Sequence, residues 1–447
     1  MDTEKGWKRF LSRERVGWIT YDWANSAFVL CVVTVLGSAY FVAMFEKAAE
    51  QAGGQRLGPA LAMQVGGITL TAEAMWSLIV AAAALFVAVS SPMLGAIADG
   101  RGKKKRFLQV YWALGVLATL ALWLQLPWWM IGLFIFLGII GFEGGNVYYN
   151  AFLPHLADPK DQDILSSAGF AAGYLGGVLV LIASLVFFVP PKGEITNAFL
   201  LIGAWWGVFG LVTFMLVPEY PPFRPEIVPG RPIASAWKEI STTVRNISHY
   251  PQAGLFLLAF LLYNDGVATM ISNATPYAMQ NIYLDKTLTE TIGLAQLIPV
   301  IILIQVIAVP GSMFTGWIAI RFTEKTSIFL ALSAFLFAVT YAQFINQLSE
   351  FYVLAVMIGM FLGGVQAISR SVFASLIPQG KQAEFFAFYA LSSKFSAFAG
   401  PLIYGMLVLL TGDTRPALLS LSVFFFLGGA VLYFVDIEKG RQQALAK

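Results

Sequence analysis

Five ionisable side chains lie inside long apolar stretches of the sequence, and they are Asp22, Glu143, Asp265, Arg370 and Lys394. A charged group at membrane depth is costly unless it faces protein or water, so such residues mark functional sites. The carboxylates could hold an ammonium group or carry a proton, and the two cations could hold a carboxylate. We therefore interpret these positions as candidate binding sites for a polar solute or an ion.

Polar residues follow several of these charges at intervals of three or four positions, which places them on one face of a helix. The sets are Asp22 and Asn25; Glu143, Asn146 and Asn150; Asp265, Thr269 and Ser272; and Gln366, Ser369, Arg370 and Phe373. Each set predicts a polar stripe along one helix.

Structural roles compete with binding roles for these charges. The pairings that the sequence leaves open are Asp22 with Arg13 or Arg15, Glu143 with Arg370, and Lys394 with Asp22 or Asp265. Asp265 lies deepest in its apolar stretch, so a purely structural role is least expected for it.

The amino-acid composition indicates that this protein lies in a lipid bilayer. Hydrophobic residues make up 58% of the 447 residues and charged residues 12%, against roughly 25% charged residues in soluble domains. A soluble fold of this length could not bury so much apolar surface, whereas a bilayer solvates it. No Walker loop, HExxH, GxSxG or dinucleotide-binding motif is present, so we expect neither an enzyme nor a bound metal or cofactor.

Twelve apolar segments are long enough to cross a bilayer. They lie near residues 17–45, 74–98, 107–126, 128–153, 164–189, 196–217, 252–282, 291–320, 326–345, 350–377, 384–410 and 414–436. We predict an N-terminal tail (1–16), a six-helix half (17–217), a linker (218–250), a second six-helix half (251–437) and a C-terminal tail (438–447).

Basic residues predict the orientation. Most of the 28 Lys and Arg residues fall in segments on the side of the N-terminus, so we expect both termini and the linker to be cytoplasmic. The run from Arg101 to Arg106 is then an inside loop and not a nucleic-acid site. We expect an integral, multi-pass protein of the cytoplasmic membrane.

The two predicted halves share a pattern. Asn150–Pro154 ends the fourth span as Ala374–Pro378 ends the tenth, and a serine pair follows each, at 166–167 and 392–393. Parallel repeats of six spans are the plan of the major facilitator fold. The sequence thus predicts an all-α membrane protein with that fold.

The loop after the second span resembles the major facilitator signature through five residues: Gly95, Asp99, Gly102, Lys103 and Lys104. The glycine allows close helix approach, and the aspartate can sit at the N-terminus of a facing helix or pair with a cation. Such a contact stabilises one conformation and must break for another, so we expect a gating role. Gly100 departs from the basic residue usual there, and the corresponding loop Gly316–Lys325 lacks the aspartate.

The string YDWANSAF (Tyr21–Phe28) and the segment from Arg370 to Gly405 resemble the vacuole-effluxer branch of the major facilitator superfamily, the autophagy-related transporters and their bacterial relatives. This resemblance covers nearly the whole chain. It implies that spans one, four, seven and ten line a central cavity, and those spans hold the four polar stripes. It also implies amino acids or similar small polar molecules as substrates.

We therefore expect a secondary transporter that moves a small polar or zwitterionic solute, similar to an amino acid, by alternating access. Protons are the candidate coupling ion, and we expect a monomer in the lipid bilayer. Two alternatives remain open at this point. One is an exporter of drugs or lipophiles with the same fold, and the other is a membrane sensor that does not transport.

Overall fold

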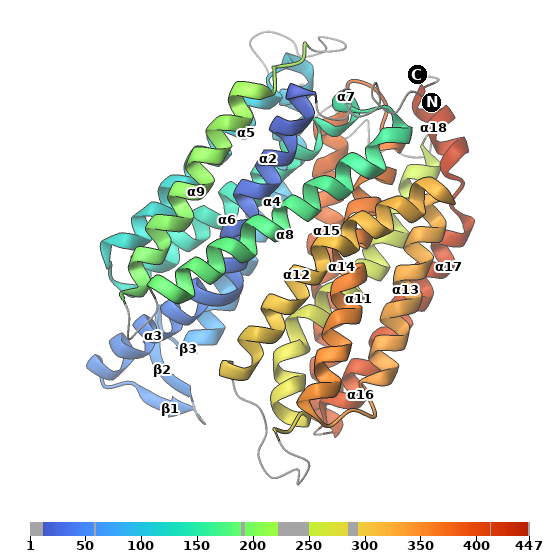
Figure 1. Cartoon of the computed structure of the whole chain (residues 1–447). Coiled ribbons are helices and arrows are strands. Elements are labelled where there is room, and N and C mark those ends of the chain that lie inside the picture. Colours follow the sequence, from blue (N-terminus) through green and yellow to red (C-terminus); the bar gives the residue numbers. More distant parts are fainter. Residues whose placement is uncertain are drawn as a thin grey trace. The chain divides into compact units, whose positions relative to one another are not determined.

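The computed structural model describes residues 12–57, 60–188, 193–221, 250–284, 294–411 and 413–445. These residues are almost entirely helical, as predicted (Figure 1). They group into two compact units. The first unit comprises Met1–Ser91, Lys103–Tyr149 and Leu175–Tyr220, and the second comprises Pro92–Gly102, Asn150–Tyr174 and Pro221–Lys447.

The first unit is built from seven helical segments. They are α2 (Arg13–Ala27), the π-helix η1 (Phe28–Val35), α3 (Leu36–Gln51), α5 (Lys104–Ala121), the 3₁₀ turn η2 (Leu122–Leu124), α6 (Trp128–Asn150) and α9 (Ile195–Leu216). Helices α4 (Ala72–Arg101) and α8 (Pro159–Phe187) contribute residues to both units.

The other helices belong to the second unit. They are α7 (Leu153–Leu156), α11 (Pro251–Asn281), α12 (Leu294–Arg321), α13 (Glu324–Tyr341), α14 (Leu348–Leu376), α15 (Gln382–Thr411), α16 (Thr414–Leu419), α17 (Leu421–Phe434) and α18 (Ile437–Leu445).

The predicted membrane spans have counterparts in the structure. Among the described residues, eleven helical segments are long and apolar enough to cross a membrane. The remaining predicted span, 384–410, coincides with the 30-residue helix α15, so a count of twelve fits the structure. The predicted linker lies mostly outside the described residues, and the division into two six-helix halves stays a prediction.

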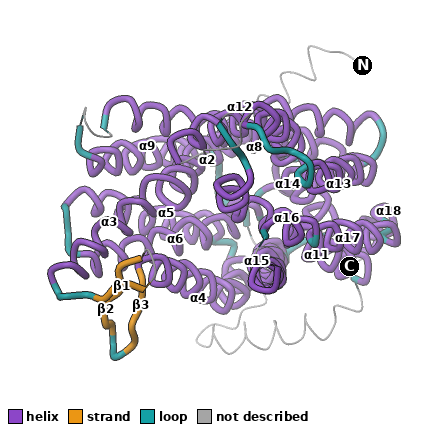
Figure 2. Tube along the Cα trace, turned by 90° about the horizontal axis from the view of Figure 1, so that it is seen from below, coloured by secondary structure: helices purple, strands orange, loops and turns teal. Residues whose placement is uncertain are grey.

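A small antiparallel sheet follows α3 and was not predicted. It comprises β1 (Gln55–Leu57), β2 (Ala60–Val65) and β3 (Ile68–Thr71) in the order β1-β2-β3 (Figure 2). Gly66 and Gly67 join β2 to β3 with φ of 60° and 84°, the left-handed conformation that a two-residue hairpin turn requires. This glycine pair between two short runs of strand-forming residues is the signal that could have identified the hairpin.

The first span contains a π-helical segment directly after the YDWANSA sequence. It covers Phe28–Val35, and the Thr34 hydroxyl donates to the carbonyl of Val29, five residues earlier, at 3.0 Å. Such wide turns are rare and occur mostly at functional sites. The first span therefore departs from regular α-helix directly after the YDWANSA sequence, which makes this position a candidate functional region.

Glycines let helices pack at backbone distance. A Cβ atom added to Gly141 of α6 would lie 2.5 Å from the Cα of Gly115 in α5. A Cβ atom at Gly95 of α4 would lie 2.7 Å from the carbonyl oxygen of Ala383 in α15. At these distances there is no room for a larger side chain. Small residues at such positions allow the close helix approach on which packing in membranes depends.

We predict that Gly141→Ala lowers the stability of the protein by about 1–3 kcal/mol, the usual range for overpacking. The matched control is Gly405→Ala in α15, because a Cβ atom there meets nothing within 4 Å. Thermal unfolding in detergent, followed by size-exclusion fluorescence, should show a lower Tm for the first variant alone. Equal melting of both variants would contradict the packing account.

Candidate functional site

In the first unit, two predicted stripes meet. Asp22 and Asn25 lie on α2 and are 8% and 2% exposed, while Glu143 and Asn146 lie half-buried on α6. The side-chain amide of Asn25 donates to the Asn146 carbonyl oxygen at 2.9 Å. The stripes of the first and fourth spans therefore contact each other, as expected if both line one polar region.

An aromatic stack holds α2 against α6. The Trp18 indole donates to the carbonyl of Tyr149 at 3.0 Å. The Tyr149 ring stacks on Trp18 and on Tyr21 with centroid distances of 4.6 and 4.9 Å. Sequence reasoning did not identify this stack, although Tyr21 and Trp18 flank the first stripe. Aromatic pairs of this kind are worth about 0.5–1.5 kcal/mol beyond area burial, so they fix the Asn25–Asn146 geometry.

In the second unit, Arg370 of α14 is buried against α8. Its Nε donates to the Ser166 hydroxyl and its Nη2 to the Ser166 carbonyl, both at 2.8 Å. Its Nη1 donates to Asn150 Oδ1 at 3.4 Å, and the guanidinium carbon lies 4.3 Å from the centroid of the Phe170 ring. The predicted residues Asn150 and Arg370 are thus brought together, and Ser166 and Phe170 are partners that the sequence analysis did not assign.

The residues of the stripe predicted on α14 contact three neighbouring helices. Gln366 accepts from the hydroxyl of Tyr174 on α8 at 3.2 Å, on the side of Arg370. Ser369 instead shares a hydrogen bond of 2.6 Å with Tyr263 of α11, and Phe373 stacks on Tyr389 of α15. Gln366 and Arg370 therefore face α8, whereas the other two residues pack within the second predicted half.

Asp265 of α11 binds the backbone of α15. Both of its carboxylate oxygens accept from the Gly400 amide at 3.0 Å, and the Thr269 hydroxyl donates to Oδ1 at 3.4 Å. Pro401 follows, and proline within a helix disturbs the preceding turn. The 1% exposed carboxylate thus acts like an N-cap for the helix after the proline. Lys394 lies on the same helix, but its side chain is outside the described residues.

The gating motif forms a sharp turn after α4. Gly102 has φ of 58°, so a left-handed residue ends the helix as glycine commonly does. Asp99 Oδ2 accepts from the backbone amide of Glu384, in the first turn of α15, at 3.0 Å. This is one of the two placements that the sequence left open for Asp99, the other being a pairing with a cation, and the gating role stays a prediction. Lys103 precedes α5, and Lys104 begins it.

A second carboxylate caps α5 and was not identified from the sequence. Glu219 accepts from the backbone amides of Lys105 at 2.8 Å and Arg106 at 3.3 Å. Burial raises the pKa of Glu219, and the two amide donors partly offset that effect. Nearby, Tyr220 donates to the Glu14 carboxylate at 2.9 Å, and burial together with this bond raises the pKa of Tyr220.

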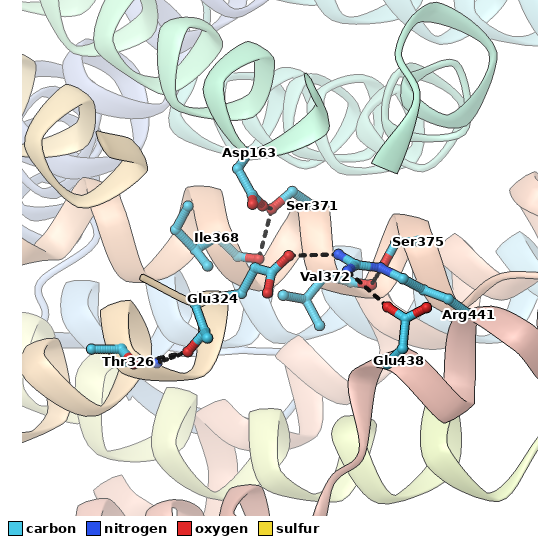
Figure 3. Close-up of polar contacts among 10 residues, drawn as sticks. Asp163, Glu324, Thr326, Ile368, Ser371, Val372, Ser375, Glu438 and Arg441 are labelled. Carbon is cyan, nitrogen blue, oxygen red and sulfur yellow. Dashed lines mark hydrogen bonds and ion pairs between the residues drawn. The ribbon is translucent and has the colours of Figure 1, made fainter. Parts of the chain in front are cut away.

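The second predicted half contains a related contact. A Cβ atom at Gly316 of α12 would clash with the Ser167 hydroxyl and lie 2.9 Å from its Cβ. The Gly316–Lys325 segment lacks the aspartate of the gating motif, and the nearby aspartate is Asp163 of α8, which contacts Ser371 of α14 (Figure 3). Glu324 and Arg441 form an ion pair of 2.6 Å beside it. Sequence reasoning missed this cluster, because Arg441 lies in the segment predicted as a tail.

No group of three metal-binding side chains occurs among the residues that the structure describes. The polar contacts instead join helices: α2 to α6, α11 to α15, α4 to α15, and α8 to α14. Polar groups of this kind can bind a polar solute, or they can stabilise one arrangement of the helices that they join.

The fold is that of major facilitator transporters. The human organic anion transporter MFSD10 matches 94% of this chain over 99% of its own, with a TM-score of 0.68 and 18% identity. A variant of the Escherichia coli fucose:proton symporter FucP matches 95% of this chain over 97% of its own, with a TM-score of 0.61 and 12% identity. This protein is therefore an integral, multi-pass membrane protein with the major facilitator fold.

The family follows from the sequence comparisons. The model of the Atg22-like vacuole effluxers matches residues 12–445. The MFS-type transporter YxiO of Bacillus subtilis is 32% identical over 445 residues, which cover 96% of each chain. The chain belongs to the Atg22-like vacuole effluxer family, as the YDWANSAF resemblance predicted. Its relatives are transporters and not enzymes.

We predict that Asp99→Ala loosens the α4–α15 contact, because loss of a capping side chain costs about 0.5–2 kcal/mol. In a Cys31→Ser, Ala383→Cys background, the buried cysteine should react with a thiol reagent roughly 3–30 times faster after this change. Glu50→Ala, which removes an exposed carboxylate of α3, is the control. An unchanged rate for Asp99→Ala would show that Asp99 does not hold this contact.

Proposed function

We propose that this major facilitator transporter moves a small zwitterionic solute, such as an amino acid, by alternating access. The observation that carries the proposal is Arg370, a 3% exposed guanidinium on a predicted cavity-lining helix, whose contacts include Ser166 and Asn150. A guanidinium binds a carboxylate through two parallel hydrogen bonds more strongly than it binds neutral acceptors. A substrate carboxylate could therefore replace these partners.

The ammonium group of a zwitterion needs an acceptor. Asp265 and Glu143 are the candidates, because each is a carboxylate within a predicted cavity-lining helix. Asp265 now accepts from the Gly400 amide, and an ammonium group donates more strongly than a neutral amide. The amides of Asn25 and Asn146 could bind the uncharged part of the solute, since each has donor and acceptor capacity.

Proton coupling is part of the proposal. A carboxylate that loses its partner in an apolar cavity takes up a proton readily, and Asp265 is the candidate carrier. The fold relative FucP is a fucose:proton symporter, so this fold accommodates such coupling. Lys394 is the candidate counter-charge.

We further propose the inner membrane as location, a monomeric state and both termini on the cytoplasmic side. The Lys and Arg residues between 101 and 106 support this orientation, because basic loops remain inside. In this orientation the Gly95, Asp99 and Gly102 turn lies on the cytoplasmic side, where its contact with α15 would open for release or uptake.

The test is uptake of labelled amino acids into proteoliposomes with an imposed pH gradient. Arg370→Ala should reduce saturable uptake by roughly 10-fold or more, because charge-assisted hydrogen bonds contribute about 1.5–3 kcal/mol. Arg321→Ala, a change of an exposed arginine at the end of α12, is the matched control and should retain uptake.

Asp265→Asn should abolish the dependence of uptake on the pH gradient while exchange of substrate without a gradient persists. Full gradient-driven uptake by Asp265→Asn would remove Asp265 as the proton carrier. Two results together would favour an exporter of lipophilic compounds over a zwitterion transporter. They are that folded wild-type protein takes up no amino acid and that Arg370→Ala leaves efflux of a lipophilic dye unchanged.

A further inference from the structure

The beginning of α8 is fixed to α14 by a buried acid. Asp163 is 3% exposed, and its Oδ1 is in hydrogen-bonding contact with the Ser371 hydroxyl (Figure 3). The same hydroxyl oxygen lies 2.9 Å from the carbonyl oxygen of Ile368. A hydroxyl has one proton, whereas a carbonyl and an ionised carboxylate only accept. The hydroxyl can therefore donate to only one of these two acceptors at a time, whereas a proton on Asp163 would let Ser371 accept from Asp163 while it donates to Ile368.

A second carboxyl group faces the same position. Glu324 begins α13, and Figure 3 shows it directed toward the part of α14 that Asp163 contacts. The charged groups that interact with Asp163 are Glu324, which opposes a further negative charge there, and Arg441, which favours it. Two carboxylates that approach each other are stabilised when they share a proton.

The C-terminal helix α18 supplies the positive charge. Arg441 forms its 2.6 Å ion pair with Glu324, donates from Nε to Ser375 of α14 at 3.2 Å, and lies 3.7 Å from Glu438. Of the three acids near Arg441, Glu438 is 71% exposed to solvent. The other two, Asp163 and Glu324, carry two negative charges against the single positive charge of Arg441 when all groups are ionised, which leaves one negative charge in excess. One proton removes that excess.

Helix α18 is itself held firmly, so Arg441 has a defined position. The side chain of Gln252 in α11 accepts from the Asp436 amide at 2.7 Å. Lys325, the neighbour of Glu324, donates to the carbonyls of Tyr433 and Val435 at 2.8 Å. These bonds fix the junction of α17 and α18 to α11 and α13.

We propose that Asp163, Ser371 and Glu324 form a proton-binding site, in which one proton is held between the acids while α8 is docked on α14. Arg441 is a positioning residue that keeps Glu324 in place. The site is separate from the proposed substrate residues, and only its consequence for transport rests on the proposed function.

Separation of α8 from α14 would expose Asp163 to water, where an ordinary carboxyl group is ionised at neutral pH. The docked state therefore binds one more proton than the separated state. Linkage then requires that acid favours docking and that alkali weakens it, by up to about tenfold in the docking equilibrium per pH unit. The cluster would act as a latch that responds to pH.

The test is infrared spectroscopy of the purified full-length protein, without substrate, across a pH titration. Wild type should show a protonated-carboxyl band that is lost on raising pH. Asp163→Asn and Glu324→Gln should each lose this band. Glu438→Gln should keep it, because Glu438 is 71% exposed and lies across Arg441 from the acid pair.

Ser371→Ala is a milder second variant that leaves both acids in place and removes their hydroxyl partner. It should retain the band with a changed midpoint, and it keeps the test decisive if Asp163→Asn folds poorly. A band unaffected by Asp163→Asn, or by Ser371→Ala where the former does not fold, overturns the proton site. Because no substrate is used, a protein that transports amino acids but lacks the band would contradict this inference alone.

Discussion

The structure depends on one constraint, which is that polar groups buried at membrane depth must bind other protein groups. For several of these groups the partner lies on another helix. Arg370 binds α8, Asp265 binds the amide of Gly400, and Asn25 binds Asn146. Each side chain therefore both satisfies its own hydrogen bonds and sets the distance between two helices. Under the proposed function, a solute that offers better partners would change those distances and so couple its binding to conformation.

Two contacts of similar design occur in the second unit. At Gly95, α4 approaches α15, and Asp99 accepts from an amide in the first turn of α15. At Gly316, α12 approaches α8, but the acid is Asp163 on α8 itself and its partner is Ser371. The first contact joins a carboxylate to a backbone dipole. The second joins it to a hydroxyl beside a second carboxyl group and an arginine, and the proposed proton site lies there.

The sequence predicted much of this arrangement where the signal is local. Apolar length predicted the spans, and the spacing of Gly95 and Asp99 left a helix-terminal contact for Asp99 as one of two alternatives. The partners of Arg370 and Asp163 were not predictable, because they lie about two hundred residues away along the chain. Neither was the role of Arg441, since a short polar helix after the last span has the same composition as a free tail. Side-chain pairing across helices is decided by packing, which periodicity alone does not encode.

The central claim is that contacts of α8 with the second predicted half form and break during transport. A Cβ atom at Gly316 would lie 2.9 Å from the Cβ of Ser167, which is shorter than the roughly 3.5–4.5 Å that a disulfide spans, so a small outward shift of the two helices would accommodate the bridge. In a Cys31→Ser background, oxidation of the Ser167→Cys, Gly316→Cys protein should stop transport in proteoliposomes, and reduction should restore it. Each single-cysteine variant, treated in the same way, is the control. Undiminished transport by the fully cross-linked protein would contradict the account.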